Sequence, residues 1–113
     1  GRDSNEVVYQ SNVNPQLWKA SLEVTKKYPL KIADNQGGFL ETDWIYDVNN
    51  NQQRCLIKIQ VLSSDLTTTG VTTNFICEIK NNVNWVPDNK DYIQESNQIT
   101  LKILEIAGNL KNT

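Results

Sequence analysis

The sequence predicts an α+β domain: a four-stranded antiparallel meander sheet with N- and C-terminal helices packed on one of its faces. Two patterns predict this fold class. Apolar residues recur every three or four positions in residues 14–27 and 91–110, as they do along one side of a helix. Between these segments, four stretches alternate apolar and polar residues and are separated by turn-forming residues. The chain order is therefore helix, four strands, helix, and a single helical layer would bury one face of the sheet.

The first helix has a clear beginning and end. Asn14 can cap the free N–H groups of the first turn, and Pro15 loses nothing at the first helical position. The residues that recur on one side are Leu17, Ser21, Val24 and Tyr28. Pro29 cannot continue the helix, so we expect it to end near Lys27.

The alternating stretches predict strands over residues 30–34, 39–47, 54–62 and 72–80. Asn35–Gly38 predicts a tight turn between the first two strands, because Gly accepts the positive φ angles of such turns. In the second strand, the face of Leu40, Thr42, Trp44 and Tyr46 carries the larger apolar area and no formal charge, so we place it against the helices. We expect loops over residues 48–53 and 63–71. A third irregular segment, 81–90, would be pinned to the core by the apolar anchor Trp85–Val86–Pro87.

Charge and hydrophobic pairing predict a register between the second and third strands. The predicted pairs are Asp43 with Lys58, Ile45 with Leu56, and Asp47 with Arg54. This register would place opposite charges together on the outer face and set Trp44 beside Ile57 on the buried face. A slip by one residue would invert every side chain, so the buried pattern constrains the pairing strongly.

The last helix is expected to start between Asp91 and Asn97. Its apolar stripe consists of Ile99, Ile103, Ala107 and Leu110. We expect residues 1–13 to form an N-terminal arm, in which Gly1 is a cleavage scar, and residues 14–113 to form one domain.

Composition argues against several classes of function. The 113 residues carry a net charge of −2, whereas a nucleic-acid-binding domain usually has a clustered basic face. No apolar run approaches the ~20 residues that cross a bilayer as a helix. Histidine is absent, which removes the commonest general base and the commonest metal ligand. We therefore expect neither enzyme activity nor a metal or other cofactor.

Two surfaces are candidate binding sites. The sheet face turned away from the helices would carry Phe39, Ile45, Leu56 and Ile76 among charged residues, and it is the candidate protein-interaction face. Alternatively, Trp18, Trp44 and Tyr46 could line a cavity for a small apolar ligand between sheet and helices. These three residues could equally be the filled core.

The cysteines and the carboxylates each allow two interpretations. Cys55 and Cys77 both point inward on neighbouring strands, where they could form a disulfide or remain two buried thiols. Glu41, Asp43 and Asp47 share one face of the second strand and could act as paired carboxylates. Since Lys58 and Arg54 are available as partners, we expect surface ion pairs instead.

The central part of the sequence resembles a known family. The matching residues are Leu17-Trp18-Lys19-Ala20-Ser21-Leu22-Glu23, Pro29-Leu30, Ala33-Asp34, Gly37-Gly38, Thr42-Asp43-Trp44, Tyr46 and Trp85-Val86. In this pattern the chain is similar to an uncharacterised lipoprotein-type family of unknown function, found mainly in alphaproteobacteria. The match covers roughly residues 12 to 110; it departs at Ile45, which is inserted between Trp44 and Tyr46, and its second half matches mostly in pattern. The layout is more distantly similar to the helix-grip domains of BamC, a lipoprotein of the outer-membrane barrel-assembly machine.

The resemblance implies a location and a class of partner. It implies export through a lipoprotein signal, a periplasmic domain, and membrane attachment only through a lipid on a cysteine outside this sequence, with outer-membrane anchoring expected. It implies no known activity, and the partners would be unidentified envelope proteins. We therefore expect a non-enzymatic protein-interaction or structural module. The alternative from the residues is a carrier of a small apolar ligand.

Overall fold

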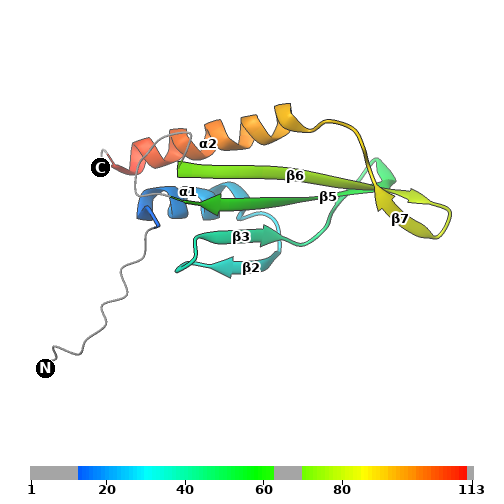
Figure 1. Cartoon of the computed structure of the whole chain (residues 1–113), viewed down its shortest axis with the longest axis horizontal. Helices are drawn as coiled ribbons and strands as arrows, with labels where there is room; N and C mark the ends of the chain where they lie inside the picture. Colours follow the sequence, from blue (N-terminus) through cyan, green and yellow to red (C-terminus); the bar gives the residue numbers. More distant parts are fainter. Residues whose placement is uncertain (1–12, 63–69, 112–113) are drawn as a thin grey trace, which may run out of the picture.

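The computed structural model describes residues 13–62 and 70–111, so residues 1–12 of the predicted arm and most of the predicted loop 63–71 lie outside the described residues. The elements, shown in Figure 1, are α1 (Pro15–Thr25), β2 (Leu30–Asp34), β3 (Phe39–Thr42), β4 (Ile45–Asp47), β5 (Asn50–Val61), β6 (Val71–Asn81), β7 (Asn84–Pro87) and α2 (Ile93–Lys111). The predicted α+β class is confirmed. The sheet has six strands instead of four, because the predicted second strand is divided and a further strand follows β6.

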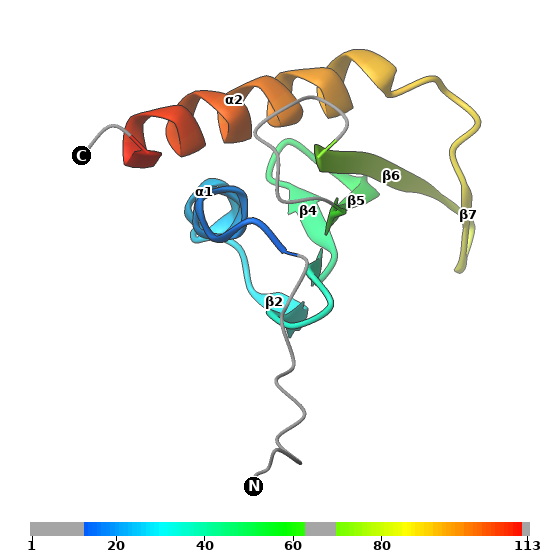
Figure 2. The same cartoon turned by 60° about the vertical axis from the view of Figure 1, so that its left-hand side comes forward.

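The sheet is antiparallel, with the order β2-β3-β5-β6-β7, and β4 pairs with β5 beyond the end of β3. Both helices lie on one side of it, with α1 running beneath α2 (Figure 2). The core between the layers consists of Leu17, Ala20, Leu40, Ile57, Ile59, Val61, Val71, Ile103 and Ala107, all 4 % exposed or less. The side-chain alternation predicted for the third strand is confirmed, since Ile57, Ile59 and Val61 lie in the core. In the fourth strand, Phe75 packs against the core and Cys77 is buried as predicted, but Ile79 is 42 % exposed.

Helix α1 begins as the sequence predicts. The Asn14 side chain accepts a hydrogen bond from the Leu17 N–H at 2.9 Å, and Pro15 occupies the first turn. Two polar residues are fully buried on its inner side. They are tolerated because the hydroxyls of Ser21 and Thr25 each donate to the carbonyl four residues earlier, at 2.8 Å.

The predicted second strand is interrupted between Thr42 and Ile45. The Thr42 hydroxyl oxygen accepts the Ile57 N–H at 3.0 Å, so a side chain takes the place of a backbone partner. The Asp43 N–H donates to the carbonyl of Pro29 instead, at 3.0 Å. Three residues of this strand therefore oppose two of β5, which is the geometry of a β-bulge. The bulge reverses the inward face beyond Thr42.

The predicted register is consequently wrong in both halves of the strand. Before the bulge, Glu41 and not Asp43 lies opposite Lys58. Beyond it, the observed pairs are Ile45 with Cys55, Tyr46 with Arg54, and Asp47 with Asn50. Trp44 and Tyr46 therefore leave the helix-facing side on which they were predicted, and Ile45 packs against the core instead.

Two predicted loops are also wrong. Most of residues 48–53 belongs to β5, which begins at Asn50. Residues 84–87, predicted as an apolar anchor on the core, form β7 and extend the sheet. The turn between β6 and β7 is tight because Asn82 adopts a left-handed conformation, with φ 58°, which Asn tolerates better than most residues. Without a glycine, this turn gives little signal in the sequence.

Candidate functional site

The candidate site lies at the end of the sheet that the helices do not cover. Figure 1 shows that β7 and the adjoining ends of β5 and β6 extend past the first turn of α2. We call this region the distal end; it comprises β4, β7, residues 50–56 of β5 and residues 76–81 of β6. It has two faces, the open face, which is turned away from the helices, and the helix-side face.

An arginine stacked between two tryptophans dominates the open face of the distal end. The Arg54 guanidinium carbon lies 4.2 Å from the ring centroid of Trp44 and 4.4 Å from that of Trp85. Arg54 also lies directly opposite Glu78 in the β5–β6 ladder, and its Nε and Nη2 both donate to Glu78 Oε1, at 2.9 and 2.6 Å. The side chains of this ion pair are only 18 % and 22 % exposed. Such a fixed, partly desolvated pair with two cation–π contacts is more ordered than an ordinary surface ion pair.

The electrostatics of this cluster keep the arginine charged. Burial lowers the pKa of Arg54, but hydrogen bonds with Glu78 and Tyr46 raise it more, so the net pKa is above its ordinary value. The Tyr46 ring lies edge-on to Trp85, with a centroid distance of 6.1 Å, and Tyr46 is 53 % exposed. We call Trp44, Tyr46, Arg54, Glu78 and Trp85 the aromatic–arginine cluster.

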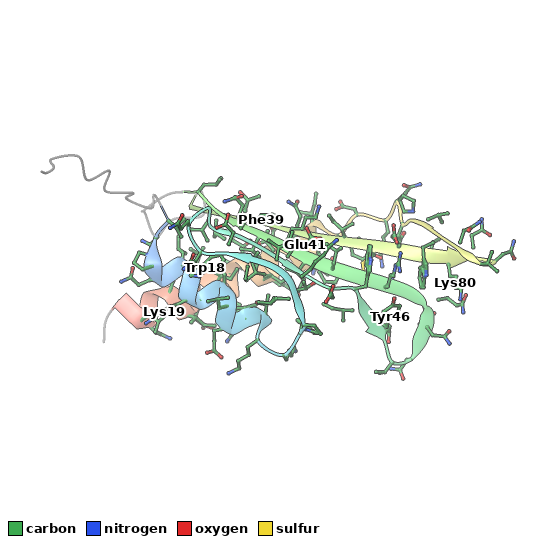
Figure 3. All side chains as sticks on the ribbon, turned by 90° about the horizontal axis from the view of Figure 1, so that it is seen from below. Trp18, Lys19, Phe39, Glu41, Tyr46 and Lys80 are labelled. Atoms are coloured by element: carbon green, nitrogen blue, oxygen red, sulfur yellow. A yellow bond between two sulfur atoms is a disulfide. The ribbon has the colours of Figure 1, made fainter. Side chains whose placement is uncertain are left out.

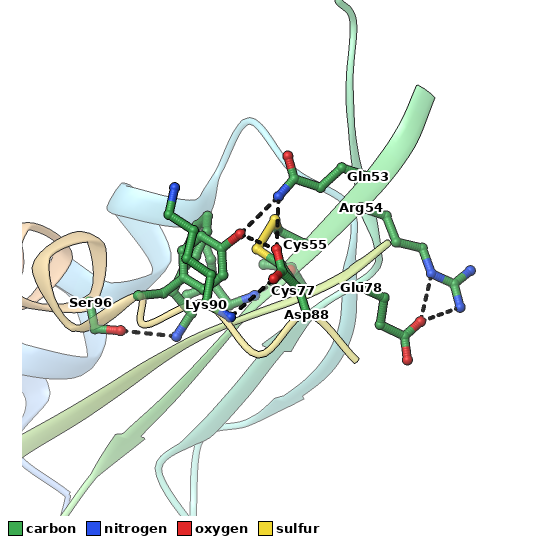
Figure 4. Close-up of a disulfide and its surroundings, with 12 residues drawn as sticks. Gln53, Arg54, Cys55, Cys77, Glu78, Asp88, Lys90 and Ser96 are labelled. Atoms are coloured by element: carbon green, nitrogen blue, oxygen red, sulfur yellow. Dashed lines mark hydrogen bonds and ion pairs between the residues drawn. A yellow bond between two sulfur atoms is a disulfide. The ribbon is translucent and has the colours of Figure 1, made fainter. Parts of the chain in front are cut away.

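On the opposite, helix-side face, Cys55 and Cys77 lie directly opposite each other and are joined by a disulfide with an S–S distance of 2.06 Å. Figure 4 shows the disulfide together with the hydrogen bonds around it. The sequence left open whether these residues form a disulfide or two buried thiols, and the structure has the disulfide. It therefore ties together the two longest strands at the point where the helical cover ends.

A polar network lies beside the disulfide. Tyr92 Oη donates to Asp88 Oδ2 at 2.6 Å, and Gln53 Nε2 donates to Tyr92 Oη at 2.8 Å. Burial, reinforced by the bond to Asp88, raises the pKa of Tyr92 to about 12. The hydrogen bond from Tyr92 and that from the Lys90 N–H lower the pKa of Asp88. This network attaches Tyr92, just before α2, to Gln53 on β5 and to Asp88, the residue after β7.

Three of the four residues predicted for the interaction face share the open face. Leu56 and Ile76 are paired in the β5–β6 ladder, and Phe39 lies on β3 opposite Gln60. Leu56 is 7 % exposed, whereas Ile76 is 39 % exposed. Ile45 is the exception, because the bulge turns it to the helix-side face.

The residues predicted to line a ligand cavity do not come together. Figure 3 shows Trp18 on α1, at the opposite end of the molecule from Tyr46. Trp18 packs against the core, and Trp44 and Tyr46 belong to the aromatic–arginine cluster. A cleft of about 560 Å³ does lie between the two helices above the sheet, but its lining is different. Its apolar lining residues are Val24, Tyr28, Ile57, Phe75, Ile99 and Ile106.

The carboxylates of the predicted second strand make surface ion pairs only in part. Glu41 lies between Lys31 and Lys58, with N–O distances of 3.8 and 4.0 Å. The expected pairing of Asp47 with Arg54 is wrong, since Arg54 binds Glu78.

Among the described residues, no group of three or more His, Cys, Asp or Glu side chains could hold a metal ion. Neither helix, over its described residues, is long and apolar enough to cross a membrane.

Sequence reasoning missed the aromatic–arginine cluster. One signal was available: Arg54 is one of only two arginines in a lysine-rich chain, and it falls on the open face of a long strand. Arg is favoured over Lys where a planar group must stack and form several hydrogen bonds at once. Its partner Trp85 could not be placed, because the strand that carries it was predicted as a loop.

The fold is thus an α+β domain with a cluster of aromatic and arginine side chains at its distal end. The chain belongs to the family described as "Domain of unknown function (DUF3576)", whose model matches residues 11–112. It is also similar to the "Uncharacterized protein RP420" of Rickettsia prowazekii (strain Madrid E), with 31 % identity over 74 residues. That alignment covers 66 % of this chain and 44 % of the relative, so the chain spans less than half of the relative's length.

Proposed function

We propose that this chain is the non-enzymatic periplasmic domain of a bacterial envelope lipoprotein and that it binds a protein partner through the open face of its distal end. The observation that carries the proposal is the aromatic–arginine cluster. Trp, Tyr and Arg are the residues that contribute most binding energy in protein interfaces. Here they are pre-organised on a rigid sheet, which lowers the entropic cost of binding.

The neighbouring residues suit an interface with an apolar centre. Ile76 lies on β6 two residues before Glu78, on the same face, and its exposed surface extends the cluster toward the middle of the sheet. Tyr46 forms the more exposed rim on β4. An interface of this kind needs a desolvated anchor surrounded by partly exposed side chains, and the cluster supplies both.

The disulfide supports a location outside the cytoplasm, because disulfides persist mainly in oxidising compartments such as the periplasm. The lipoprotein anchor is proposed from the resemblance of the sequence to a lipoprotein-type family. The full-length gene tests it: a secretion signal followed by a lipid-accepting cysteine is expected, and a signal without that cysteine would refute the anchor.

Site-specific photo-crosslinking in cells that produce the full-length protein tests the interface. We expect a crosslinker at Tyr46 to capture a discrete protein, and the capture to be lost on Trp85→Ala. The matched control is a crosslinker at Leu101, which is 64 % exposed on α2 and lies outside the distal end. Equal capture from both positions, or capture that persists in the Trp85→Ala variant, would refute the proposed interface.

A second candidate function is supported by the cleft between the helices. Its volume of about 560 Å³ falls within the range of ligand pockets, and its lining is mostly apolar. This function is the binding of a small apolar ligand between sheet and helices. A saturable one-to-one interaction with an uncharged alkyl probe such as dodecanol would support it, and the absence of binding would refute it.

A further inference from the structure

The cleft of about 560 Å³ between the helices, which we call the main cleft, is one part of a longer surface. A second cleft of about 420 Å³ adjoins it and shares three lining residues, Glu23, Lys26 and Ile106. Together the two clefts form one trough between α1 and α2, the two helices seen one above the other in Figure 2. The trough reaches from Glu95 to Leu110 along α2, which at 1.5 Å per residue is roughly 22 Å.

The trough is long enough to hold one extended acyl chain together with its head group. The hydrocarbon layer of a bilayer is ~30 Å thick and holds two chains end to end, so one chain spans roughly 15 Å. The main cleft offers an apolar bed for such a chain, because Ile57 and Phe75 form its floor and Val24, Ile99 and Ile106 its walls.

The charged residues that line the trough favour a ligand with a negatively charged head group. Its lining contains four lysines, Lys19, Lys26, Lys27 and Lys102, and two glutamates, Glu23 and Glu95. The trough is therefore positively charged, although the chain as a whole has a net charge of −2.

Neighbouring carboxylates already neutralise two of these lysines. Lys26 pairs with Glu23, and Lys102 pairs with Glu105 at 3.0 Å. Lys19 has no carboxylate partner among the described residues, and Lys27 lies over the Tyr28 ring at 5.2 Å.

From these observations we propose that the trough binds a single-chain fatty acid, with its alkyl chain in the main cleft and its carboxylate near Lys19. The inference rests on the second proposed function, ligand binding between sheet and helices, and names its ligand class. It does not depend on the aromatic–arginine cluster.

Calorimetric titration with dodecanoate, dodecanol and dodecyltrimethylammonium tests the proposal, with the two ions kept below their micelle concentrations and dodecanol below its solubility limit. We expect one-to-one binding in the order carboxylate, alcohol, cation, with dodecanoate about 2- to 5-fold tighter than dodecanol because Lys19 contributes one exposed ion pair. Removing each methylene should weaken binding by up to about 4-fold, which corresponds to ~0.8 kcal/mol per buried CH₂. Equal affinity for dodecanoate and dodecanol would overturn the fatty-acid inference and leave the second proposed function standing, whereas no binding of any probe would overturn both.

Two variants locate the ligand. Lys19→Gln should remove the preference for the carboxylate and leave dodecanol binding unchanged; the matched control is Lys80→Gln, outside the trough. Val24→Trp should fill the main cleft and weaken dodecanoate by at least about 10-fold, whereas Leu101→Trp, outside this trough, should not. Unchanged binding by a folded Val24→Trp variant, verified by its circular dichroism, would overturn the proposal.

Discussion

Reduction of the Cys55–Cys77 disulfide should destabilise the domain by an amount that follows from its place in the chain. The two cysteines are separated by 22 residues. Cross-linking a loop of this length removes chain entropy from the unfolded state worth about 3.4 kcal/mol at 25 °C. Unfolding entropy of ~2.1 cal/mol/K per residue gives roughly 0.24 kcal/mol/K for a chain of 113 residues. The Tm of the reduced protein should therefore be lower by about 14 °C.

Thermal unfolding of the oxidised and reduced proteins, followed by circular dichroism, measures this difference. Cys77 is only 3 % exposed, so the bond should be reduced in denaturant and the protein refolded in the presence of reductant. The Cys55→Ala/Cys77→Ala double variant is the control, because its Tm should not respond to reductant at all. A difference below about 4 °C between the oxidised and reduced proteins would refute the reasoning, since it would mean that the bond does not restrict the unfolded chain.

Three further predictions concern single side chains. Arg54→Lys keeps the charge but loses the planar stacking on two indoles, and urea unfolding should show a loss of about 1–2 kcal/mol; a loss below about 0.3 kcal/mol would contradict the importance of stacking. Thr42→Val leaves the buried Ile57 N–H without its acceptor and should cost about 1–3 kcal/mol, whereas Thr72→Val, at an exposed position on β6, should change stability little. Tyr92 has a folded-state pKa of about 12, above its ordinary value of 10, so its neutral form is favoured in the folded protein. The stability that depends on Tyr92 should be complete below pH 10 and be lost between pH 10 and 12; a tyrosinate absorbance titration in which all tyrosines ionise near pH 10 would contradict this.

The sequence predicted those parts of the fold that depend on local patterns. Asn14, Pro15 and Pro29 mark the limits of α1 through backbone chemistry that needs no tertiary contact. Strand alternation placed Ile57 and Ile59 in the core because the period of a strand is independent of its partner. These predictions would hold for almost any arrangement of the surrounding elements.

The register failed because it depends on a contact between residues distant in sequence. The bulge is associated with a hydrogen bond from the Ile57 N–H to Thr42 Oγ1, across 15 residues. Nothing in the local sequence around Thr42 indicates that its hydroxyl will replace a backbone carbonyl. One such replacement was enough to move Trp44 and Tyr46, two of the five residues of the aromatic–arginine cluster, to the open face.

The bulge also places on the open face the aromatic rings that help to stabilise the distal end. Past the first turn of α2 the sheet lacks a helical layer, and a small sheet without such a layer is only marginally stable (Figure 1). Here the disulfide ties β5 to β6 on the helix-side face, and the stacked Arg54 holds Trp44 and Trp85 against the other face. Because covalent and cation–π contacts replace a buried core, the aromatic rings contribute to stability while remaining partly exposed. A partner that buried them would require no rearrangement of the sheet, and this is the physical basis for proposing an interaction site at the distal end.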